Sequence, residues 1–164
     1  MEYTQRFAHL SSDGVHRYEL SRTWFQPASK GTLYYIMLNP STADANFDDP
    51  TIKKCVGFAE RNLYNAIRVY NLFSFRATDP RNLPMDSRAT DEMNDTILAN
   101  VPKDEDVVVA WGGNAYKNEF GRARVKRVLE LIDRELFCVR QSNGRPHHPL
   151  YVPYGVLTPF EVPA

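Results

Sequence analysis

The chain has few cysteines, no long hydrophobic run and no excess charge of either sign. Its two cysteines, Cys55 and Cys138, are too few for a disulfide scaffold. Cys55 shares a helical spacing with Ile52, Val56 and Ala59, an arrangement typical of the buried face of a helix. We therefore predict that both cysteines are free thiols in the core.

The charge and hydropathy of the chain bear on whether nucleic acid or a membrane is an expected partner. Lys plus Arg and Asp plus Glu each number 20, so the net charge is zero. Contact with nucleic acid would then need a local basic patch, because no overall field attracts it. The N-terminus lacks a basic start before an apolar stretch, and no run approaches the roughly 18 apolar residues of a membrane span. We expect a cytoplasmic protein with no membrane partner; a protein partner cannot be named.

The size and composition suit one packed domain covering residues 1–164, because 43% of the residues are hydrophobic and 12% aromatic. Residues 18–25 and 32–38 are predicted to be strands that pair as an antiparallel hairpin across the turn-prone segment QPASKG. Residues 66–75 are rich in β-branched and aromatic side chains and predict a buried strand. The apolar run VVVAW at 107–111 predicts a strand in the sheet centre.

Three helices are expected between these strands. Asp49 and Pro50 suit the N-cap and first position of a helix that ends near Leu63. Capping chemistry starts a second helix at 90–100, and apolar residues at helical spacing predict a third over 115–135. Residues 136–139 would then form the last strand. The alternation predicts an α/β three-layer sandwich: a central, mostly parallel sheet of about four strands plus an N-terminal antiparallel hairpin extension.

In such a sheet, ligands bind beyond the carboxyl ends of the strands, so we inspected each strand end. Asn39 precedes Pro40, which restrains its backbone and suits an amide that holds a water or a ligand carbonyl, or one that closes a turn. Asp44, Asp48 and Asp49 follow. A carboxylate there could orient an attacking water, although capping a helix would also explain Asp49.

The next two strand ends also carry polar groups. Asn71 lies in an apolar run, and its side chain offers the donor and acceptor needed to read a nucleobase edge, or to bond neighbouring backbone. Arg76 could hold a phosphate or pair with Asp79. After Trp111, two glycines allow close approach of backbone to a ligand, although a simple turn with a core Trp fits equally.

The last candidate is His148, whose orientation is restrained by Pro149, although a histidine in a tail is often an exposed spectator. The sequence contains no His-Glu-x-x-His or paired-Cys spacing, no phosphate-loop signature and no nucleotide-binding glycine fingerprint. We therefore expect no metal and no cofactor.

Four segments resemble a bacterial and phage family, domain of unknown function 1643. They are MLNPSTADANFDDPTIKKC, NLFSFRATDP, VVAWGG and HHPLY. The same segments, in the same order, are similar to motifs of the uracil-DNA glycosylase superfamily, which implies that superfamily's fold. The resemblance implies that Asn39 positions the hydrolytic water, Asn71 reads the base and His148 stabilises the departing base. The chain differs after Pro149, where Leu150 and Tyr151 replace the usual serine.

The leading hypothesis is an N-glycosidase acting on a nucleobase, foremost a modified one in DNA, with a nucleotide as the alternative substrate. Catalysis would rest on Asn39, Asp49 and His148. The other expected substrate-binding residues are Ser41, Asn71, Phe73, Arg76, Trp111, Asn114 and Tyr151, with Phe73 or Trp111 offering a stacking face.

Two alternatives come from other classes. One is a non-catalytic protein that sequesters a nucleotide or a nucleotide-derived signal, and the other is a protein-interaction module. For duplex DNA, the basic residues at 122, 124, 126 and 127 would supply a stripe, but a solvated helix face is the favoured explanation of these residues.

Overall fold

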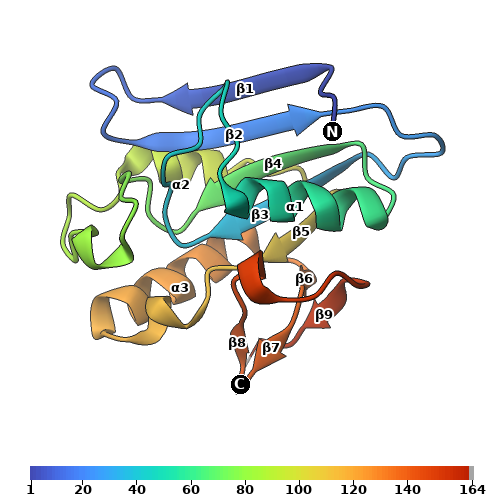
Figure 1. Cartoon of the computed structure of the whole chain (residues 1–164). Helices are drawn as coiled ribbons and strands as arrows, with labels where there is room; N and C mark the ends of the chain where they lie inside the picture. The colour runs from blue at the N-terminus through green and yellow to red at the C-terminus, as the bar shows by residue number, and fades with distance from the viewer. Residues whose placement is uncertain (163–164) are drawn as a thin grey trace.

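The computed structural model describes residues 1–162. They form three layers, in which one large sheet lies between helices on its two faces (Figure 1). The sheet has seven strands in the order β1-β2-β4-β3-β5-β6-β9. Its four middle strands, β4, β3, β5 and β6, run parallel, while β1 and β2 on one side and β9 on the other pair antiparallel. The mixed α/β class and the mostly parallel centre are as predicted, but the sheet is wider than expected.

The strands of this sheet are β1 (Gln5–Leu10), β2 (Arg17–Thr23), β3 (Thr32–Met37), β4 (Ala66–Asn71), β5 (Asp106–Val109), β6 (Leu136–Cys138) and β9 (Thr158–Phe160). The α-helices are α1 (Pro50–Arg61), α2 (Glu92–Ala99) and α3 (Glu119–Ile132). Short 3-10 helices lie at η1 (Pro80–Asn82), η2 (Gly113–Tyr116) and η3 (Pro149–Tyr151). A small two-stranded ribbon pairs β7 (Gln141–Ser142) with β8 (Arg145–Pro146).

The two faces of β3 show how the layers are built. Successive strand residues point to opposite faces, and β3 is buried on both. Tyr35 and Met37 belong to a hydrophobic cluster with α1, whereas Tyr34 and Ile36 belong to a second cluster with α2 and α3. Figure 1 shows α1 in front of the sheet and the other two helices behind it.

The predicted hairpin between residues 18–25 and 32–38 is wrong. β2 pairs antiparallel with β1 and β4, so the N-terminal hairpin is β1–β2. β3 instead lies between β4 and β5, in parallel register with both. Because both edges of β3 are occupied by these buried strands, β2 can reach the sheet only beside β4.

The first helix forms as predicted. Asp49 is the N-cap of α1, with its Oδ1 accepting a hydrogen bond from the Ile52 backbone N–H at 2.9 Å, and Pro50 is the first helical residue. Asp91 caps α2 in the same way, through the Asn94 backbone N–H at 3.0 Å. Both caps satisfy an N–H that a helix start leaves without a partner.

The third helix and the last strand differ from expectation. Residues 113–116 form η2, and α3 begins only at Glu119, because Asn118 accepts a hydrogen bond from the Gly121 N–H and so caps a new helix. β6 is not the last strand, since β9 returns to pair with it. Pro159 is tolerated in β9 because this strand lies at the edge of the sheet.

Two further expectations concern the cysteines and the membrane. Cys55 and Cys138 are free and buried, as predicted. Within residues 1–162, every helix is too short or too polar to cross a membrane.

Candidate functional site

A cavity of about 690 Å³ lies at the carboxyl ends of β3, β4 and β5. This volume is within the range of small-molecule sites. Its lining includes predicted site residues from four separate segments, namely Asn39, Ser41, Asp49, Asn71, Trp111, Asn114 and His148. The structure therefore brings the motifs that follow the parallel strands β3, β4 and β5 into one pocket, as the shared edge of such strands requires, and the segment before η3 adds His148 to it.

Asn39 is half-buried, and its side chain is held in one orientation. The Nδ2 amide donates to the backbone oxygens of Pro40 at 3.0 Å and Ala77 at 2.8 Å. Both partners are carbonyl oxygens, which only accept hydrogen bonds, so the amide atom that faces them is the donor Nδ2 and not the acceptor Oδ1. In the described part of the chain Oδ1 has no hydrogen-bond partner, and it can accept a hydrogen bond from a water or ligand in the cavity.

Asp49 and Arg17 are the two buried charged residues of the cavity lining. Asp49 is 9% exposed and uses Oδ1 to cap α1, which leaves Oδ2 for the cavity. Arg17 is 2% exposed and donates through Nη1 to the Ala43 oxygen at 2.7 Å, while its Nε has no partner within residues 1–162. Burial lowers the pKa of Arg17 to about 10, and the charge of Asp49 opposes that shift.

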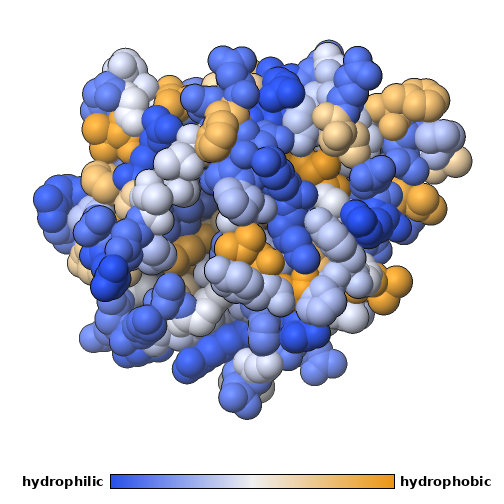
Figure 2. All heavy atoms as spheres, in the orientation of Figure 1, coloured by the Kyte–Doolittle hydropathy of each residue, from blue (hydrophilic) through white to orange (hydrophobic). Residues whose placement is uncertain are grey.

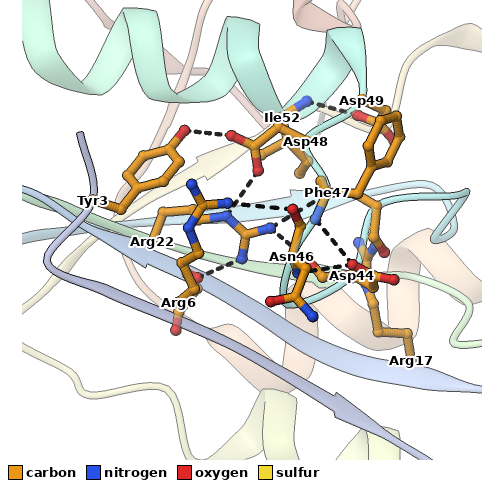
Figure 3. A network of polar contacts seen from close by, with 12 residues as sticks. Tyr3, Arg6, Arg17, Arg22, Asp44, Asn46, Phe47, Asp48, Asp49 and Ile52 are labelled. Carbon is orange, nitrogen blue, oxygen red and sulfur yellow. Dashed lines mark hydrogen bonds and ion pairs between the residues drawn. The ribbon is translucent and has the colours of Figure 1, made fainter. Parts of the chain in front are cut away.

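The loop that carries Asn39 and Asp49 is anchored to the sheet by Arg22 (Figure 3). The guanidinium of Arg22 is fully buried and forms an ion pair with Asp48, Nε to Oδ1 at 2.8 Å. It also donates to the backbone oxygens of Asp44 and Phe47. This network occupies Asp48 and holds the loop in the shape that presents Asn39 and Asp49.

Asn71 ends β4 at the cavity wall and is 1% exposed. Its Nδ2 and Oδ1 are both buried, and neither has a hydrogen-bond partner among residues 1–162. A buried amide without partners costs roughly 1–3 kcal/mol, so such groups are rare in folded proteins. Asn71 is the one residue of the cavity lining whose side-chain amide has both polar atoms buried without a partner in the described chain.

The backbone oxygens of Asn71 and Leu72, by contrast, both accept hydrogen bonds from side chains of the helices. Asn94 of α2 donates from Nδ2 to the backbone oxygens of Asn71 and Leu72, at 3.2 Å and 3.4 Å. Arg124 of α3 donates from Nε to the same Leu72 oxygen at 2.6 Å and pairs with Asp95 at 2.6 Å. Two helices thus fix the end of β4 and with it the position of the Asn71 side chain.

Trp111 and Gly112 follow β5. The Trp111 ring is 1% exposed, donates from Nε1 to the Tyr116 hydroxyl at 3.0 Å and packs edge-on against Phe160. Gly112 has φ +77° and ψ −179°, a conformation that is essentially restricted to glycine. A Cβ on Gly112 would lie 3.4 Å from the Cβ of His148, an ordinary van der Waals contact, so the backbone conformation rather than the space is what requires glycine here.

His148 is half-buried at the cavity, immediately before η3. Its Nδ1 accepts a hydrogen bond from the Leu150 backbone N–H at 3.2 Å, so the proton of the neutral ring is on Nε2. Desolvation lowers the pKa of His148, and the charge of Asp49 opposes this shift. At neutral pH His148 is therefore an uncharged ring with an Nε2–H donor.

Three predicted site residues lie outside this cavity. Phe73 is fully buried and stacks on Phe120, with ring centroids 5.6 Å apart. Arg76 lines an adjoining hollow of about 380 Å³, and it does not pair with Asp79, which binds Arg81 instead.

Tyr151, the third of these residues, is 90% exposed and lines a second adjoining hollow, which shares Gly112 and His148 with the main cavity. The predicted basic stripe on α3 is also incomplete, because Arg124 is buried in the interior and is neither part of a stripe nor on a solvated face.

Sequence reasoning missed three cations that line the cavity: Arg17, Lys117 and Arg145. Arg17 is the first residue of β2, in which alternate residues are buried. The alternation of apolar and polar residues in this strand, extended back by one position, is the sequence signal that points to Arg17. Lys117 and Arg145 reach the site only because η2 and the β7–β8 ribbon fold beside it. No cluster of three or more metal-binding side chains occurs within residues 1–162.

Taken together, the elements define an α/β protein with a cavity at the carboxyl edge of its parallel strands. The family described as "Protein of unknown function (DUF1643)" matches residues 17–150, and the chain belongs to this family. No curated protein and no solved structure matches the chain.

Proposed function

We propose that the cavity binds a nucleobase and that the protein hydrolyses the bond between this base and its sugar. The observation that carries the proposal is the buried, unpartnered carboxamide of Asn71 in the cavity wall. A carboxamide presents one donor beside one acceptor, which complements the edge of a nucleobase. Met37, Ile52 and Val69 add apolar surface against which a flat ring can pack.

Asn39 and Asp49 are suited to hold the attacking water. The Oδ1 atoms of amides and the oxygens of carboxylates accept hydrogen bonds from water, and both residues have one such oxygen left. The water oxygen forms a bond to the sugar C1′ while the bond from C1′ to the base nitrogen breaks. The electron pair leaves with the base, and Asp49 accepts the proton that the water loses.

His148 is suited to stabilise the departing base. Negative charge develops on the base as the bond breaks, and a preorganised donor in a site with little water lowers the energy of that state. The Nε2–H of His148 is such a donor, and its ring is oriented by the Leu150 N–H. These roles agree with those implied by the resemblance to the uracil-DNA glycosylase superfamily, a likeness that rests on the short motifs alone.

A second candidate, a protein that binds a nucleotide without cleaving it, is favoured by one observation. Asp49 already has a structural task as the N-cap of α1, which accounts for its presence without any catalytic role. A protein-interaction module has less support. The cavity is open, and Figure 2 shows a largely hydrophilic face on which hydrophobic residues occur in scattered groups.

The test is an assay for free base by mass spectrometry. The native protein is incubated with single- and double-stranded DNA carrying normal, deaminated or modified bases, and with a panel of nucleotides. Release that is lost in Asn39→Ala and His148→Ala but kept in the controls Asn82→Ala and His147→Ala supports the glycosidase. Asn82 is exposed, and His147 bonds Ser142 outside this cavity. Tight nucleotide binding without base release would instead establish the second candidate.

A further inference from the structure

The charges around the cavity are unbalanced. Three cationic side chains, Arg17, Lys117 and Arg145, line it, and Asp49 is the one carboxylate among the described lining residues. None of the three cations forms an ion pair with a carboxylate of residues 1–162. Unpaired positive charge in a concave site attracts an anionic ligand.

The cation inside the cavity is costly to the free protein. Arg17 is 2% exposed, and its Nε lacks a partner within the described chain. Burying a charged group without full hydrogen bonding is unfavourable unless an opposite charge compensates it. Asp49 provides part of that compensation, and an anionic ligand would provide more.

The two cations at the rim are placed beside the glycine turn after β5. Lys117 directly follows η2, and Arg145 lies in β8 with its guanidinium 4.9 Å from the centroid of the Tyr116 ring. The Tyr116 hydroxyl in turn accepts the hydrogen bond from Trp111. Arg145 is therefore oriented by a ring that is itself fixed to the cavity wall, and less side-chain entropy is lost when it binds an anion.

The surface near α3 is poorly suited to the long backbone of a duplex. Arg124 is buried against Asp95, and the Nε of Arg127 lies 3.9 Å from the same carboxylate. Arg122 donates to the backbone oxygen of Tyr116. Since duplex binding depends on many phosphate contacts, this favours a ligand with a single, local phosphate.

We propose that the cavity takes its nucleobase as part of a nucleoside monophosphate, with the phosphate bound by Lys117 and Arg145. This inference rests on the proposed nucleobase site and names the substrate class. The phosphate could belong to a free nucleotide or to the end of a DNA strand, and the binding experiment includes both.

The experiment measures dissociation constants by calorimetry for deoxynucleosides, their 5′-monophosphates, ribose 5-phosphate and a 5′-phosphorylated oligonucleotide. We expect each monophosphate that binds to do so about tenfold tighter than its nucleoside, because the phosphate adds charge-assisted hydrogen bonds to two exposed cations. Lys117→Gln with Arg145→Gln should reduce that preference to about twofold or less. The matched control, Lys126→Gln with Arg127→Gln, removes the same two charges on α3 and should leave the preference unchanged.

Equal binding of nucleoside and monophosphate, a preference that survives in the Lys117 and Arg145 variant, or no binding of any probe would overturn the inference. Failure of the proposed nucleobase site would give a different result. Ribose 5-phosphate would bind as tightly as the monophosphates, and Asn71→Ala would leave the dissociation constants of the monophosphates unchanged. The preference for phosphate could still depend on Lys117 and Arg145 in that case. Tighter binding of the oligonucleotide than of the free monophosphate assigns the phosphate to a strand end.

Discussion

The side-chain amide of Asn94 donates a hydrogen bond to the backbone oxygen of Asn71, 3.2 Å away, while the side chain of Asn71 itself bonds nothing within residues 1–162. The two asparagines lie side by side in the interior, and both are almost fully buried. Their side-chain amides differ in the hydrogen bonds that they form. The Nδ2 of Asn94 stabilises the end of β4, whereas both polar atoms of the Asn71 side chain are buried without a partner in the described chain.

This difference predicts opposite effects of the same substitution. Asn71→Leu removes two unsatisfied polar atoms, so the free energy of unfolding should stay the same or rise by about 1 kcal/mol, while nucleotide binding is lost. Asn94→Leu removes hydrogen bonds to two backbone oxygens and should lower the free energy of unfolding by roughly 1–3 kcal/mol. Urea denaturation of both variants measures this. Equal destabilisation by the two substitutions would show that Asn71 has a structural partner.

The glycine pair after β5 gives a second prediction. Gly112→Ala forces a side chain into a φ of +77° and a ψ of −179°, so it should lower the free energy of unfolding by about 1–3 kcal/mol through backbone strain. Relief of that strain should shift the adjoining His148 segment and reduce base release. Gly113→Ala is the matched control, because Gly113 has no positive φ and a Cβ there meets nothing within 4 Å. Thermal unfolding and base release are the measurements. If both variants behave alike, the backbone conformation of Gly112 does not restrict this position to glycine.

The loop anchor gives a third prediction. Arg22→Met leaves Asp48 as a partly buried charge without its ion pair, and it leaves backbone oxygens of the loop unbonded. Breaking such a buried pair costs about 3–5 kcal/mol, and hydrogen exchange in residues 40–49 should become faster. Tyr3→Phe removes one hydrogen bond to Asp48 and should cost only about 0.5–1.5 kcal/mol. Unchanged exchange in the loop after Arg22→Met would contradict the anchoring role.

His148 gives the prediction on pH. Its pKa in the folded protein lies below the ordinary value of about 6.5, chiefly because of desolvation, so the unfolded chain binds its proton more readily. The contribution of His148 to stability is therefore complete above about pH 6.5, and it falls as the pH drops through the folded-state pKa. His148→Gln should reduce the loss of stability between about pH 7.5 and about pH 5.5, as measured by urea denaturation. An identical loss in the variant would rule out this titration.

The sequence predicts well the structural features that depend on residues close together in the chain. The cap of α1 by Asp49 follows from one residue and the proline after it. The meeting of Asn39, Asn71 and Trp111 at one cavity follows from a general property of parallel sheets, namely that their strand ends share an edge, whereas His148 reaches the cavity from the segment before η3.

The features that the sequence did not predict depend on residues far apart in the chain. The alternation in β2 indicates a strand, but whether it pairs with β3 or β4 is decided by which edges the buried strands leave free. The cavity cations Arg17, Lys117 and Arg145 come from three separate segments with no shared motif. Local rules also placed the start of the third helix too early, because Asn118 competes as a cap.

The most direct test of the central claim is a crystal structure of the Asn39→Ala protein with a nucleoside monophosphate, since this variant should bind the ligand without cleaving it. The account predicts that the base lies in the cavity with Oδ1 and Nδ2 of Asn71 each at about 2.7–3.2 Å from a polar atom of its edge. It also predicts that Nε2 of His148 faces the base. A ligand bound elsewhere, or a base in the cavity with the Asn71 amide still unpartnered, would contradict it.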